Sequence, residues 1–140
     1  MSIFKLTEFD FKRRIKIANT FDWIEIKTHN IEETANFYEN LFGWKIIEKE
    51  TAEGLDVWIF DTGGTPRLQN LQRGSIWLRP ANETPGIIVY IVVNNIDSTL
   101  NKVVGLGGKI VTPKTLQGPH FRACCTDPGG NLFGLWEETN

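Results

Sequence analysis

The chain has 140 residues, of which 41% are hydrophobic and 11% aromatic, and its formal net charge is −2. This length is enough for one compact domain with a sizeable core. The balanced charge argues against a nucleic-acid partner, which needs a basic patch. No run approaches the roughly 18 apolar residues of a membrane span, and the segment 1–20 holds no apolar signal sequence, so we expect a cytoplasmic protein without a membrane partner.

The sequence of the first half of the chain predicts an arm followed by one strand–helix–strand–strand–strand unit. Residues 1–20 are an arm that either packs on the domain edge or is exchanged with a partner subunit. Strand 23–28 leads to helix 31–42, which Asn30 caps together with Glu33 in a variant of the capping box and which Gly43 ends. Three strands then follow, at 44–51, 55–61 and 75–78, with a polar loop at 67–73.

The second half repeats the first at a constant offset. Asn95 and Gly108 correspond to Asn30 and Gly43. After a linker at 81–85, we expect the following elements: strand 87–93, helix 96–104, strand 109–112, a loop at 113–119, strand 120–126, a turn at 127–130 and strand 132–136. This order favours an α+β fold rather than a doubly wound sheet.

Two stretches resemble the signature sequences of the vicinal oxygen chelate superfamily, the group of glyoxalase I, bleomycin-resistance proteins and extradiol dioxygenases. They are Phe37-Tyr38 with Leu41-Phe42-Gly43-Trp44, and Thr126-Asp127-Pro128-Gly129-Gly130-Asn131-Leu132-Phe133-Gly134-Leu135. The resemblance covers residues 21–138. It implies two tandem βαβββ modules, at 21–80 and 86–138, that form a curled sheet around a shared cavity, commonly in a homodimer. Within the superfamily, the chain looks nearest to the uncharacterised single-domain glyoxalase-related group.

The resemblance also implies where a divalent metal would bind. Its ligand positions fall on Trp23, Ile88 and Gly134, and the fourth lies near residues 75–79. None of the three side chains is an imidazole, carboxylate or thiolate, which are the groups that bind such metals. His29 and His120 have no partner at metal spacing, and His29 is better explained as a loop or cap residue. We therefore expect no metal and no cofactor.

Strand alternation predicts which residues line the cavity. If Ile24 and Ile26 pack on the helix, Trp23 and Glu25 face inward, and the same parity places Ile88 and Tyr90 inward in the second module. The remaining cavity positions, on other strands, are Trp58, Trp77, Arg79, His120, Arg122, Gly134 and Trp136. Most of the tryptophans are also explained by core packing alone. Gly134 is expected to leave space where the family carries a glutamate.

Two functions fit these residues. The first is a protein of the bleomycin-resistance type that binds a small organic molecule in an aromatic-lined cavity without metal. The alternative is a lyase or isomerase related to lactoylglutathione lyase, with Glu25 as general base and Tyr90 beside it. Burial disfavours the charged form of a carboxylate and so raises its pKa, which suits a general acid or base. Glu25 tied to a cation or a backbone N–H, with a purely structural role, remains open.

Overall fold

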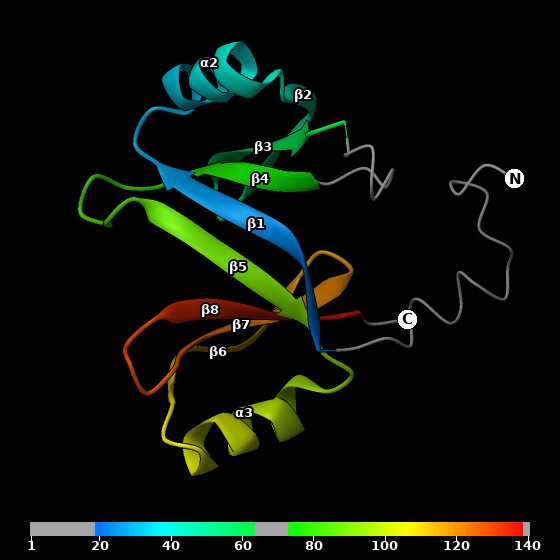
Figure 1. The fold of residues 1–140 in the computed structure, drawn as a ribbon, viewed down its shortest axis with the longest axis vertical. Coiled ribbons are helices and arrows are strands. Elements are labelled where there is room, and N and C mark those ends of the chain that lie inside the picture. The colour runs from blue at the N-terminus through cyan, green and yellow to red at the C-terminus, as the bar shows by residue number, and fades with distance from the viewer. Residues whose placement is uncertain (1–18, 64–72, 139–140) are drawn as a thin grey trace, which may run out of the picture. The chain divides into compact units, whose positions relative to one another are not determined.

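A computed structural model describes residues 19–63 and 73–138 of the chain. The predicted arm up to residue 18, most of the predicted loop at 67–73 and the last two residues lie outside the described part. Contacts divide the described residues into two compact units, with residues from Trp23 to Ile87 in one and residues 19–22 together with those from Ile88 onward in the other. Each unit contains one helix and one group of strands (Figure 1).

The first module has the predicted βαβββ order. Its strands pair in the spatial order β2-β3-β4-β1, with β1 parallel to β4 and the other pairs antiparallel. The helix packs on one face of these strands (Figure 1). The elements are β1 (Thr20–Thr28), α2 (Ile31–Phe42), β2 (Lys45–Ala52), β3 (Leu55–Asp61) and β4 (Arg73–Leu78).

The second module repeats this arrangement. Its strands pair in the order β5-β8-β7-β6, and β5 is parallel to β8. The elements are β5 (Gly86–Val92), α3 (Ile96–Gly105), β6 (Lys109–Gln117), β7 (His120–Thr126) and β8 (Leu132–Glu138). The predicted α+β class and the two βαβββ modules are therefore confirmed.

Both helices begin at an asparagine, as the sequence predicts. The Asn30 side chain accepts a hydrogen bond from the Glu33 backbone N–H at 3.1 Å, and its amide donates to the Glu33 carboxylate at 3.2 Å. The Asn95 side chain accepts from the Ser98 backbone N–H at 2.8 Å. These bonds satisfy backbone donors that have no partner within the helix. Neither α2 nor α3, the helices of the described residues, has the length and hydropathy of a membrane-crossing segment.

The core of each module lies between its helix and its sheet. In the first, Ile26, Ile31, Ala35, Phe60 and Ile76 form the buried cluster. In the second, the corresponding cluster consists of Val93, Ile96, Leu100, Ala123, Cys125 and Leu135. The other face of each sheet therefore carries the residues that do not serve the helix core.

The prediction of a loop at 113–119 is wrong, because β6 continues to Gln117. Proline lacks the N–H that a central strand must donate, so it is confined to edge strands and bulges. Pro113 meets both conditions, since β6 pairs only with β7 in its module and the register shifts between Thr112 and Thr115. The proline thus marks an irregularity in the strand and not its end.

Candidate functional site

The module-one face opposite α2 is built from β1 and β4. The register places Glu25 beside Ser75 and Lys27 beside Trp77. Ile24 and Ile26 pack into the helix-side cluster, which confirms the alternation predicted for β1. Glu25 and Lys27 therefore lie on the opposite face from the helix.

Glu25 is the buried carboxylate of this face. It is 5% exposed and Ser75 is 4% exposed. The Trp23 indole N–H donates to Ser75 Oγ at 3.2 Å. Trp23 and Glu25 both lie on β1, so this bond holds the Ser75 hydroxyl against the strand that carries the carboxylate. A buried carboxylate is costly unless it is paired or hydrogen-bonded, and Glu25 is not without a partner in the structure. The result is a polar centre between aromatic side chains.

Arg79 closes the carboxyl end of the same face. Its guanidinium lies 3.9 Å from the centre of the Trp77 ring. It donates from Nε to both Glu83 oxygens at 3.1 and 3.0 Å, and from Nη1 to Glu53 at 3.2 Å. Burial by itself lowers the pKa of Arg79, but the hydrogen bonds and charges of Glu83 and Glu53 outweigh it and raise the pKa. Arg79, which was predicted to line the cavity, is thus already engaged by two carboxylates of its own chain.

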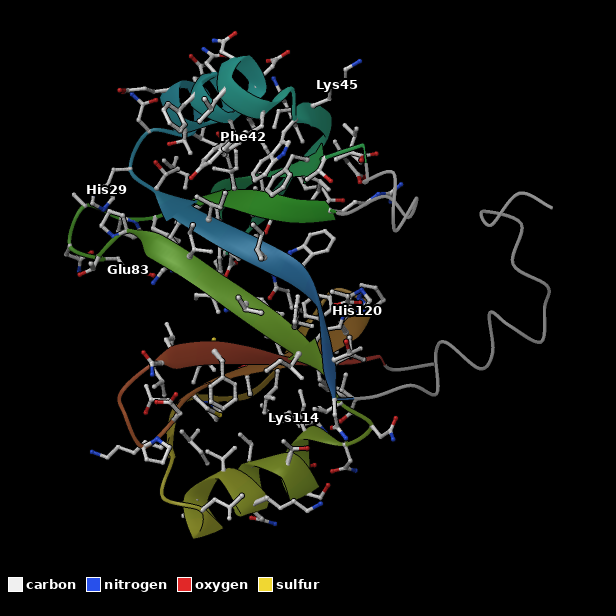
Figure 2. The ribbon with its side chains drawn as sticks, viewed as in Figure 1. His29, Phe42, Lys45, Glu83, Lys114 and His120 are labelled. Carbon is white, nitrogen blue, oxygen red and sulfur yellow. The ribbon has the colours of Figure 1, made fainter. Side chains whose placement is uncertain are left out.

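The segment after β4 is held to the end of β1 by the same glutamate. His29 Nε2 lies 2.6 Å from the Glu83 carbonyl oxygen, and Figure 2 shows the two residues together at this end of the strand. Lys27 Nζ is 3.9 Å from the Glu83 carboxylate. His29 is therefore a loop residue, as the sequence predicts. Glu83 and Glu53 were missed, although the four-residue spacing between Arg79 and Glu83 was a usable signal.

Trp58 does not belong to this face. The register pairs it with Ile76, and it packs against the helix-side cluster that contains Phe60. Lys49 Nζ lies 4.1 Å from the centre of its ring. The predicted cavity position of Trp58 is therefore wrong. The physical reason is parity: Val57 and Ile59, not Trp58, pair with Trp77 and Ser75.

The module-two face opposite α3 brings most of the other predicted residues together. β8 places Gly134 between Tyr90 and Cys124, and Trp136 between Val92 and Arg122. Ile88 and Tyr90 are 3% and 2% exposed. His120 lies at the start of β7, with its ring centre 4.2 Å from that of Trp136. Arg122 and His120 have the same parity on β7, so they share this face.

Tyr90 fills the space that Gly134 was expected to leave open. A Cβ atom added at Gly134 would lie 2.8 Å from Tyr90 Cζ and still closer to Cδ1 and Cε1. The ring of Tyr90 is held edge-on to Trp136, with 5.9 Å between the ring centres. The predicted space at Gly134 is therefore occupied by an aromatic ring. Glycine is required here because the ring lies directly on the strand.

The residues of these positions do not fit the divalent metal that the resemblance implies. A carboxylate at position 134 would collide with the buried Tyr90 ring. Among the residues that the structure describes, no three His, Cys, Asp or Glu side chains are grouped closely enough to hold a metal ion.

Cys124 and Cys125 lie on opposite faces of β7. The Arg122 guanidinium donates to Cys124 Sγ at 3.5 Å, and the Tyr90 hydroxyl lies 3.9 Å from the same sulfur. Cys125 belongs to the core beneath α3, where burial, together with the neighbouring Cys124, raises the pKa of its thiol. Cys124 is thus part of the polar face, whereas Cys125 behaves as a small apolar core residue.

Sequence comparison finds relatives about twice as long as this chain. One relative is CFP32 of Mycobacterium tuberculosis (strain CDC 1551 / Oshkosh), a protein that carries the provisional name of a glyoxylase. It is 28% identical over 130 residues, which cover 90% of this chain and 48% of that protein. The anthracycline biosynthesis protein DauV of Streptomyces sp. (strain C5) is 25% identical over 126 residues, or 83% of this chain and 46% of that one. The chain therefore spans about half the length of these relatives.

Solved structures share the fold at low sequence identity. A variant of the methylmalonyl-CoA epimerase of Streptomyces coelicolor, in complex with 2-nitronate-propionyl-CoA, superimposes with a TM-score of 0.65 at 16% identity, covering 89% of this chain and 100% of that one. The hypothetical protein BH1468 of Bacillus halodurans C-125 gives a TM-score of 0.65 at 17% identity, covering 89% and 97%. Residues 20–135 match a family model, and the chain belongs to the Glyoxalase/Bleomycin resistance protein/Dioxygenase superfamily.

Proposed function

We propose that this protein binds a small organic molecule on a sheet face that a helix leaves uncovered, and that it does so without a metal ion. The observation that carries this proposal is the Tyr90 ring on Gly134. It replaces a metal-ligand position of the superfamily with a buried aromatic surface. Binding then depends on shape, apolar contact and a few polar groups, which is the usual composition of a small-molecule site.

Glu25 supplies the polar centre of the proposed site. Its carboxylate accepts hydrogen bonds or pairs with a cation, and Ser75 beside it both donates and accepts. Trp23 and Trp77 surround this pair with aromatic surface on the same face. We therefore expect a ligand with an apolar, preferably aromatic, body and a donor or cationic group. The relative named for anthracycline biosynthesis makes polycyclic aromatic compounds the first ones to test.

The alternative is an isomerase or lyase in which Glu25 removes a proton next to a carbonyl group. It is favoured by the position of Glu25, whose side chain lies on the face opposite α2, with Ser75 beside it on β4. The methylmalonyl-CoA epimerases of similar fold show that this fold can accommodate an isomerase, which supports the alternative. Tyr90 is a second proposed catalytic residue, in module two, and its hydroxyl lies 3.9 Å from Cys124 Sγ.

A thermal-shift screen tests the binding proposal. The compounds are polycyclic aromatics, thiol conjugates, bleomycin-type antibiotics and acyl-CoA thioesters. A ligand present at 100 times its Kd raises the free energy of unfolding by about 2.7 kcal/mol. We expect Glu25→Gln to lose this shift and Glu32→Gln, a matched change at an exposed residue of α2, to retain it. Equal shifts in both variants would exclude Glu25 from the site.

Two further measurements separate the alternatives. NMR in D₂O follows exchange of the proton next to the ligand's carbonyl group, and loss of exchange in Glu25→Gln supports the isomerase. Binding with no exchange in the unaltered protein supports binding alone. Elemental analysis of protein purified without chelators addresses the metal, and stoichiometric zinc, nickel, manganese or iron would contradict metal independence.

A further inference from the structure

His120 has a buried ring nitrogen that no hydrogen bond satisfies. Its Nδ1 atom is covered, and the part of the chain that the structure describes offers it neither a donor nor an acceptor. Buried polar atoms of native proteins are almost always paired, because an unpaired one has lost water without gaining a partner. His120 itself is half-buried at the start of β7 (Figure 2). The imidazole therefore lies at the margin of the covered surface with a hydrogen bond still to be made.

Aromatic surface holds the His120 ring on the face opposite α3. The ring centre lies 4.2 Å from that of Trp136, and the two ring planes are inclined by 36°. The last torsion of a histidine side chain is broad, so the ring can turn on this surface and present its nitrogen outward. A planar molecule that contacts Trp136 would meet the imidazole at the edge of the same surface. An aromatic body and a hydrogen-bonding group thus belong together at this site.

A positive charge lies at the same end of this face. Arg122 follows His120 by two residues on β7, so the two side chains point to the same side of the sheet. The Arg122 guanidinium donates from Nη1 to Gln117 Oε1 at 3.1 Å, and Gln117 pairs with His120 across the β6–β7 hairpin. It also lies 5.5 Å from the centre of the Tyr90 ring. These contacts hold the guanidinium in place, so its charge acts on the His120 end of the face.

The equivalent strand of module one shows that the fold does not require this basic pair. β3 and β7 both have seven residues, and they begin at the constant offset of the internal repeat. At that offset, His120 corresponds to Leu55 and Arg122 corresponds to Val57. Both residues of module one are apolar, and Val57 is buried. The two basic residues therefore serve something other than the folding of a βαβββ module.

We propose that this end of the module-two face is a binding site for an aromatic carboxylate. The imidazole donates a hydrogen bond to the carboxylate, and this bond selects the tautomer that carries the proton on the donating nitrogen. The Arg122 charge favours an anionic group, since hydrogen bonds and contacts between opposite charges are stronger than neutral ones. The aromatic body of the ligand covers Trp136. This inference goes beyond the site around Glu25, because it uses module two alone and selects a ligand of the opposite charge.

NMR of the full chain tests the proposal through its two histidines, His29 and His120. Comparison with His29→Asn assigns the two sets of ring resonances. Naphthoate is then titrated, with naphthamide as its uncharged counterpart and inorganic phosphate as an anion without an aromatic body. We expect naphthoate to shift the His120 resonances saturably and to leave those of His29 unchanged, with naphthamide and phosphate binding at least tenfold more weakly. Unmoved His120 resonances would overturn the proposal, and so would equal binding of either comparison compound.

His120→Phe removes the ring nitrogens and retains a ring that can pack on Trp136. It is expected to weaken naphthoate binding at least tenfold in calorimetry. The melting temperature should not fall, because the described residues give Nδ1 no hydrogen bond that could be lost. The control is His29→Phe, which removes the contact with the Glu83 carbonyl oxygen and should leave naphthoate binding unchanged. Unchanged binding in His120→Phe would contradict the proposal. So would a lowered melting temperature of His120→Phe in a protein that does not bind naphthoate, since an internal water would then pair with Nδ1.

The charge of Arg122 has its own test. Arg122→Gln removes the charge and keeps hydrogen-bonding atoms, so the affinities for naphthoate and naphthamide should become similar. An undiminished preference for the carboxylate would exclude Arg122 from the site. The thermal-shift comparison of Glu25→Gln with Glu32→Gln decides the site around Glu25 separately, because neither variant enters the titration of the His120 resonances.

Discussion

Replacing Gly134 with alanine tests the contact between Tyr90 and β8 directly. The new Cβ atom would lie 2.8 Å from Tyr90 Cζ and closer to two other ring atoms. Tyr90 is 2% exposed, so its ring has no open space into which to move. Overpacking of a buried site of this kind costs about 1–3 kcal/mol. We therefore expect the free energy of unfolding to fall by about that amount, with a melting temperature lower by about 3–12 °C.

Urea unfolding of four proteins measures this effect and its cause. Gly134→Ala is compared with the unaltered protein, with Tyr90→Ala and with the double variant. Once the ring is absent, the added methyl group has room, so the double-mutant cycle should give a coupling free energy of about 1–3 kcal/mol. Gly86→Ala is the control, since a Cβ at Gly86 in β5 meets no atom within 4 Å, and it should change stability by less than ~0.5 kcal/mol. A Gly134→Ala cost that is the same with and without the Tyr90 ring would refute the packing argument.

The helix caps and the turn before β8 give further predictions. Asn30→Ala and Asn95→Ala should each lower the free energy of unfolding by about 1 kcal/mol, whereas the same sites changed to aspartate should be near neutral, as urea unfolding can show. The Asn131 side chain and backbone N–H hold the pKa of Asp127 below its usual range. Because the folded pKa is depressed, this stabilisation is present above about pH 4 and is lost as the pH falls through the folded pKa. An NMR titration should show the Asp127 pKa moving toward its ordinary value in Asn131→Ala, and an unchanged pKa would contradict the assignment.

Local patterns in the sequence were sufficient for the helices and for the first strand of each module. The caps at Asn30 and Asn95 depend on residues three apart, so they can be read without knowledge of the fold. Alternation along β1 correctly separated Ile26 from Glu25, because the apolar residues had to face a helix that follows at once. The internal repeat then transferred this assignment to β5.

Features that depend on pairing between distant strands could not be read in the same way. The face of Trp58 is decided by the register of β3 against β4, and nothing within β3 distinguishes its two sides. The contact of Tyr90 with Gly134 requires the parallel register of β5 and β8, which are separated in sequence by a helix and two other strands. Arg79 was predicted to line the cavity, but its partner Glu53 comes from the turn between β2 and β3. These contacts are properties of the assembled sheet.

The opposite orientation of the two cysteines limits the redox chemistry of the polar face. Consecutive side chains of a strand point away from each other, whereas a disulfide needs Cβ atoms about 3.8 Å apart. The chain contains no other cysteine. A disulfide between Cys124 and Cys125 would therefore require β7 to unfold locally, so the two thiols cannot act as a redox pair while the strand is intact.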